Sequence, residues 1–132
     1  MVEYADGKII AEVKDGVGRV TFNQPEKRNA MSIAMWDGLS HALESFEADE
    51  AVRCVVLTGA GDKAFVSGAD ISQFEKNRSD ADAQKEYGRK TGGGRKRLLN
   101  YPKPVIAEIR GFCMGGGLGI AMSCDIRIAS SD

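Results

Sequence analysis

Two glycine-rich stretches, each lying between a strand-like and a helix-like segment, constrain this chain more than any other feature. The first spans residues 65–71 (Phe-Val-Ser-Gly-Ala-Asp-Ile), and the second spans residues 111–121 (Gly-Phe-Cys-Met-Gly-Gly-Gly-Leu-Gly-Ile-Ala). A helix that begins after such a turn exposes backbone N–H groups with no partner inside the helix, and these donors attract negative charge. If the two helix starts converge on one point, they form an oxyanion hole, which indicates a class of reaction before any side chain is assigned a role.

The first part of the sequence predicts a hairpin followed by a helix. Two strand-like segments, 9–13 and 19–22, flank the turn Asp15-Gly16, whose residues tolerate positive φ. Ser32 is a candidate N-cap, and apolar residues then recur at helical spacing through about Asp49.

Strand-like and helix-like segments alternate from residue 32 onward, which predicts the α/β class. Residues 52–58 form a nearly continuous apolar run, which is typical of a strand covered on both faces. The segments 105–110 and 124–129 are also expected to be strands, and 116–123 a short helix. Residues 75–97 are charged and interrupted by glycines, so we expect this segment to be mobile or helical only in pieces.

Composition excludes several classes of function. The 132 residues suit one domain, and 18 basic against 19 acidic residues give a net charge of -1, which favours neither nucleic acid nor a membrane surface. No apolar run approaches the roughly 18 residues of a membrane span, and residues 1–6 do not resemble a signal peptide. Cys54, Cys113 and Cys124 lack metal-ligand spacing. We expect reduced, mostly buried thiols, no metal site and a cytoplasmic protein.

Common catalytic and nucleotide-binding motifs are missing. Ser67 does not lie in a G-x-S-x-G elbow, and His41, the single histidine, falls within an amphipathic helix, where a structural or solvent-facing role is expected. The glycines of 111–121 do not fit G-x-G-x-x-G in any register, which disfavours a dinucleotide site. The basic cluster 90–97 is not a P-loop; it could meet phosphates, but a solvated, flexible loop is the favoured interpretation.

Three acidic residues near the motifs have ordinary structural explanations. Glu108 and Arg110 share one face of a predicted strand and suggest a surface ion pair. Asp70 lies where a helix would begin, so we expect it to be a cap. Asp125, just before a strand, is also expected to be structural.

Taken together, the segments resemble the crotonase superfamily, the enoyl-CoA hydratase/isomerase family. The resemblance covers essentially the whole chain, and its segments are 9–23, 25–31, 55–58, 65–71, 103–111 and 114–129. It implies a crotonase-like spiral of ββα turns, with residues 1–132 forming the N-terminal part of a single core domain. It also implies assembly into a homo-trimer or hexamer, largely through C-terminal helices outside these residues. The resemblance predicts an acyl-CoA thioester as substrate and no separate cofactor.

The family's site residues map onto both glycine motifs. Its two oxyanion-hole N–H groups correspond to Ala69 and Gly116, and one such donor is worth about 10²–10³ in rate. Its CoA-binding positions correspond to Lys27, Arg28, Ala30, Val66, Ser67, Gly68 and Ala69. A lysine often found after the Gly-Ala-Asp-Ile run is here Ser72.

One position departs from the pattern of a hydratase. The family's hydratases carry a glutamate three residues past the second oxyanion glycine, and this chain has Gly119 there. Hydration needs one acid to activate water and another to protonate carbon, and the second acid would lie beyond residue 132, so we expect the isolated chain to be inactive. Hydration, a double-bond shift, decarboxylation, acyl-CoA hydrolysis and non-catalytic acyl-CoA binding all remain open.

Overall fold

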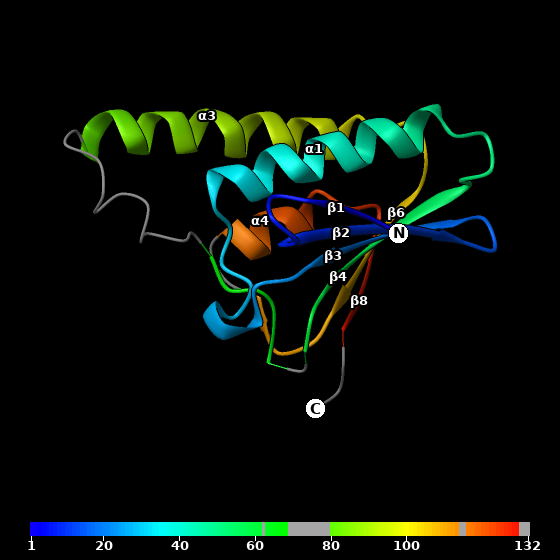
Figure 1. The fold of residues 1–132 in the computed structure, drawn as a ribbon, viewed down its shortest axis with the longest axis horizontal. Helices are drawn as coiled ribbons and strands as arrows, with labels where there is room; N and C mark the ends of the chain where they lie inside the picture. Colours follow the sequence, from blue (N-terminus) through cyan, green and yellow to red (C-terminus); the bar gives the residue numbers. More distant parts are fainter. Residues whose placement is uncertain (62, 69–79, 114–115, 130–132) are drawn as a thin grey trace.

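The computed structural model describes residues 1–61, 63–68, 80–113 and 116–129, and it has a six-stranded sheet with helices on one face (Figure 1). Helix α1 lies against β1, β2 and β3, and the long helix α3 lies alongside α1. The elements are β1 (Val2–Tyr4), β2 (Ile9–Lys14), β3 (Val17–Phe22), the short 3-10 helix η1 (Pro25–Lys27), α1 (Ile33–Ala48), β4 (Cys54–Gly59), β5 (Ala64–Val66), α3 (Asp80–Leu99), β6 (Val105–Ile109), β7 (Phe112–Cys113), α4 (Gly116–Met122) and β8 (Ile126–Ala129). The α/β class predicted from the sequence is confirmed.

The strands divide between two sheets in a repeating way. The large sheet has the order β1-β2-β3-β4-β6-β8, antiparallel from β1 to β3 and parallel from β3 to β8. The small sheet pairs β5 with β7 in parallel. Each of β4 and β6 is thus followed by a strand of the small sheet and then by a helix, as expected for ββα turns.

The hairpin and the first helix begin as predicted. Asp15 and Gly16 have φ values of 53° and 82°, and positive φ at both central residues is the geometry that matches the twist of a two-residue hairpin. The Ser32 hydroxyl accepts a hydrogen bond from the Met35 N–H at 3.2 Å, which caps α1.

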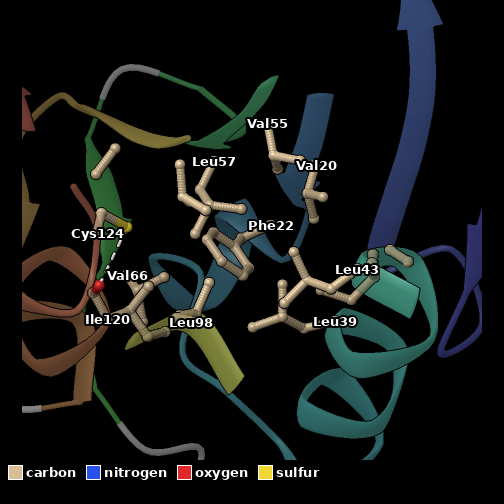
Figure 2. Packing of buried hydrophobic residues seen from close by; sticks show 14 of the residues in the cluster. Val20, Phe22, Leu39, Leu43, Val55, Leu57, Val66, Leu98, Ile120 and Cys124 are labelled. Atoms are coloured by element: carbon tan, nitrogen blue, oxygen red, sulfur yellow. Dashed lines mark hydrogen bonds between the residues drawn. The ribbon is translucent and has the colours of Figure 1, made fainter. Parts of the chain in front are cut away.

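The core lies between the large sheet and the helices. Figure 2 shows Phe22 at its centre, with Leu57 of β4 on one side and Leu39 of α1 on the other. Phe22 also meets Phe65 edge to face, with ring centroids 5.5 Å apart. The small sheet therefore shares the core of the large one, which fixes the position of the first glycine motif.

Within the segment 75–97, which was expected to be mobile or helical in pieces, residues 80–97 instead belong to one continuous helix, α3, while 75–79 lie outside the described residues. Three interactions offset the cost of its glycines. Gly94 is buried against Trp36 of α1, and Leu98 is 2% exposed. The Tyr87 hydroxyl donates a hydrogen bond of 2.9 Å to the Met31 carbonyl. Tertiary packing of one face supplies most of the stability of a protein helix, so propensity alone gave the wrong answer.

Strand β4 also differs in part from its prediction. Val55 and Leu57 are fully buried, whereas Cys54 and Val56 on the opposite face are only half-buried. Complete coverage therefore holds for one face of the strand.

Candidate active site

The two segments predicted to bind CoA lie side by side. The Ser67 N–H donates to the Arg28 carbonyl at 3.1 Å, and the Met31 N–H donates to the Gly68 carbonyl at 2.7 Å. The Ser67 hydroxyl also reaches the Lys27 carbonyl at 3.4 Å. The loop that follows η1 and the chain that leaves β5 are thus joined backbone to backbone.

The predicted positions in these segments differ in what they can offer a ligand. Val66 is fully buried and Ala30 is 8% exposed, so their side chains belong to the interior. Lys27 and Arg28 are exposed, and Ser67 and Gly68 are half-buried. Ala69 lies outside the described residues, as do Asp70 and Ser72.

Asn29, which sequence reasoning missed, holds this loop in place. Its buried side-chain amide donates to the carbonyls of Ala60 at 3.1 Å and Ala64 at 2.9 Å, and its oxygen accepts from the Gln24 N–H at 2.9 Å. Arg28 and Asn29 both have left-handed backbone, with φ of 51° and 57°. Asparagine tolerates that conformation better than most residues, and this was the signal available in the sequence.

A positively charged surface pocket of about 250 Å³ lies beside this loop. Arg28 and Lys63 contribute its cations, and the remaining lining residues are Pro25, Asn29, Ala60, Gly61 and Ala64. Ligand pockets usually measure about 300–1,000 Å³, so this one suits a fragment of a ligand rather than a whole cofactor-sized molecule. Its charge favours an anionic group such as a phosphate.

The second glycine motif lies against the first. Gly111, at φ 71°, passes so close to the Lys63 backbone that a Cβ would collide with it. Strand β7 then pairs with β5 in parallel, with Val66 opposite Cys113. Parallel strands have their C-terminal ends on the same side of a sheet. The chain that leads to Ala69 and the chain that leads to Gly116 therefore leave the small sheet on the same side. Helix α4 begins at Gly116 and packs against both strands.

Gly119 faces an arginine. A Cβ built at Gly119 would lie 3.1 Å from Nε and 3.2 Å from Cζ of Arg95, a residue of α3. The position at which the family resemblance predicts a hydratase's glutamate is therefore next to a guanidinium group.

The structural roles expected of His41, Glu108 and Asp125 are confirmed, whereas the cap expected at Asp70 lies outside the described residues. His41 is exposed and stacks on Tyr4, with ring centroids 6.1 Å apart. Glu108 pairs with Arg110 at 3.3 Å. The Asp125 carboxylate accepts from the Val105 N–H at 2.8 Å, which joins the start of β6 to the chain entering β8.

The basic cluster 90–97 lies within α3 rather than in a flexible loop, and its Lys90 pairs with Asp37 at 2.7 Å. The three cysteines are free; Cys124 is buried, while Cys54 and Cys113 are half-buried. Burial raises the pKa of Cys124 from 9.0 to about 12. In the described residues, no helix is long and apolar enough to cross a membrane, and no group of three or more His, Cys, Asp or Glu could hold a metal ion.

The chain also matches known proteins in sequence. The sequence profile of the enoyl-CoA hydratase/isomerase family matches residues 12–132. The chain belongs to that family. It is 43% identical over 128 residues to a short-chain-enoyl-CoA hydratase of Clostridium acetobutylicum, which covers 94% of this chain and 47% of that protein. It is also 43% identical over 124 residues to the mitochondrial enoyl-CoA hydratase of Pongo abelii, covering 92% and 41%.

Solved structures give the same result for the fold. A crystal structure of an enoyl-CoA hydratase/isomerase from Xanthobacter autotrophicus superimposes with a TM-score of 0.88 and 39% identity, covering 95% of this chain and 46% of that one. An enoyl-CoA hydratase/carnithine racemase from Magnetospirillum magneticum superimposes with a TM-score of 0.86 and 39% identity, covering 96% and 47%. The chain spans about half the length of the curated relatives that it matches.

Proposed function

We propose that this member of the enoyl-CoA hydratase/isomerase family acts on acyl-CoA thioesters by stabilising an enolate in an oxyanion hole. The two donors are the backbone N–H groups of Ala69 and Gly116. The observation that carries the proposal is the parallel pairing of β5 with β7, because both glycine motifs then continue from the C-terminal ends of neighbouring strands. Two N–H groups that converge there would stabilise the charge that enters the thioester carbonyl.

The CoA part of the substrate is assigned to the joined loop segments, in which Arg28 and Ser67 share a backbone hydrogen bond. Arg28 and Lys63 place two positive charges in a pocket whose size suits a phosphate-bearing group. The thioester itself is the substrate, so no separate cofactor enters the proposal.

The reaction that follows enolate formation is hydration or a double-bond shift of an enoyl-CoA. A double-bond shift needs only one base, which removes a proton and returns it to a neighbouring carbon. Gly119 cannot move a proton and lies against Arg95. This favours, as a second candidate, an acyl-CoA hydrolase, a decarboxylase or a non-catalytic acyl-CoA-binding protein.

A parallel assay of the complete gene product separates these reactions. Crotonyl-CoA and a 3-enoyl-CoA are followed through the absorbance of the conjugated thioester. Loss of signal from crotonyl-CoA would indicate hydration, and gain of signal from the 3-enoyl substrate alone would indicate isomerisation. Binding without either change would favour the second candidate, and absence of acyl-CoA binding would refute the proposal.

A homo-trimer or hexamer is proposed as the assembly. Its support in this structure is apolar surface near the C-terminal end: Met122, Ile126 and Ile128 are each at least half exposed, at 56%, 50% and 57%. Light scattering of the complete gene product gives the stoichiometry directly.

A further inference from the structure

Arg95 differs from its basic neighbours on α3. Arg89 pairs with Glu86 at 2.6 Å, and Lys90 pairs with Asp37 at 2.7 Å. Within the part of the chain that the structure describes, Arg95 makes no hydrogen bond or ion pair. Its guanidinium nevertheless lies against another element, because it approaches α4 at Gly119. Arg95 is an exposed residue, and its charge lies next to the second glycine motif with no carboxylate of the described residues paired to it.

Glycine at 119 is what allows this approach. The Cβ of any other residue would lie 3.1 Å from Nε and 3.2 Å from Cζ of Arg95, which is tighter than ordinary van der Waals contact. The guanidinium would then have to give way by a few tenths of an ångström. Gly119 and Arg95 therefore form one unit, in which the absence of a side chain on α4 makes room for the cation from α3.

This unit lies close to the proposed thioester site. Gly119 follows Gly116 by three residues, so the two positions share one face of α4 and are about 4.5 Å apart along its axis. If the thioester carbonyl accepts from the Gly116 N–H, the guanidinium is within reach of a short acyl chain. A guanidinium stays protonated at all ordinary pH values and binds a carboxylate through two parallel hydrogen bonds.

We propose that Arg95 binds a carboxylate on the acyl chain, and that the substrates are short acyl-CoA thioesters carrying a second carboxylate. This inference rests on the proposed function, since it needs the thioester at Gly116. Arg95 is here a specificity-determining residue, and no proton transfer is assigned to it. A solvated surface arginine without a ligand is the competing explanation.

The test compares the binding of two thioesters to the complete gene product by isothermal titration calorimetry. Glutaconyl-CoA has a terminal carboxylate, and pent-2-enoyl-CoA has the same number of chain carbons but ends in a methyl group. We expect glutaconyl-CoA to bind roughly ten- to a hundredfold more tightly, as is typical of one hydrogen-bonded charge. Arg95→Gln should remove that preference and leave the affinity for pent-2-enoyl-CoA unchanged.

Arg97→Gln is the matched control, because Arg97 is an exposed arginine of the same helix and its replacement removes the same charge. It should preserve the preference. Equal binding of the two thioesters by the unmodified protein, or equal weakening of both by Arg95→Gln, would overturn the inference alone. Binding of neither thioester would overturn both the inference and the proposed function.

Discussion

Three glycines near the end of α3 should respond in opposite ways to the same substitution. A Cβ at Gly94 would lie 2.6 Å from Cε3 and 2.7 Å from Cζ3 of Trp36, whose rigid ring is 1% exposed. At Gly92 and Gly93 a Cβ would meet nothing within 4 Å. Alanine at 92 or 93 should therefore stabilise the protein, while alanine at 94 should force the core apart.

The expected size follows from two known effects. Replacing glycine by alanine inside a helix gains about 1 kcal/mol at all three positions. Overpacking a close-packed core costs about 1–3 kcal/mol, and only Gly94→Ala incurs it. The propensity gain cancels when variants are compared, so the free energy of unfolding should be about 1–3 kcal/mol lower for Gly94→Ala than for Gly93→Ala.

Urea denaturation measures this difference, with the fluorescence of the single tryptophan as the signal. Trp36 is the residue that Gly94 touches, so its native emission should also change in Gly94→Ala and stay constant in Gly93→Ala. Equal stabilisation by both substitutions would refute the reasoning, because it would mean that the helix does not need the close approach to Trp36.

Three further experiments test other parts of the structure. Asn29→Ala should lower the free energy of unfolding by about 3 kcal/mol and weaken acyl-CoA binding, because two carbonyls and one N–H lose their buried partner. Calorimetry and urea denaturation measure both effects. The free energy of unfolding should fall as pH rises from about 9 toward about 12, because Cys124 ionises in the unfolded chain near its ordinary pKa of 9.0 and in the folded chain only near about 12. Urea denaturation at pH 8 and 10.5 measures this loss. The double substitution Ile126→Lys with Ile128→Lys should reduce self-association in light scattering, because it places charge on an exposed apolar edge strand.

Each of these tests has a matched control. Asn23→Ala removes a single hydrogen bond to the Gly7 carbonyl, so it should cost less and leave acyl-CoA binding unchanged. Cys124→Ala should make the loss of stability with pH shallower, and an unchanged slope would contradict the assignment to this thiol. Val13→Lys adds a charge to β2, and an equal effect on association would show that the edge strand is not special.

The sequence by itself determined the features that depend on neighbouring residues. The Asp15-Gly16 turn has positive φ at both residues, and Ser32 caps α1, because each needs only its own conformation and a few adjacent N–H groups. The alternation of strands and helices was predicted for the same reason. The family resemblance added the likeness of the two glycine motifs to known site segments.

Only the tertiary structure decided which distant segments meet. The glycines of α3 predicted a broken helix, yet Gly94 lets α3 pack on Trp36, and that burial outweighs the loss of propensity. In the sequence, Asn29 is one polar residue of a loop. Only the fold brings its amide to the carbonyls of Ala60 and Ala64. In the sequence alone, Gly119 is only the position of a missing acid. The fold places α3 beside α4, and the Arg95 side chain then lies against Gly119. Periodicity and turn rules describe interactions along a few residues, whereas burial, close approach and charge pairing depend on which elements the fold brings together.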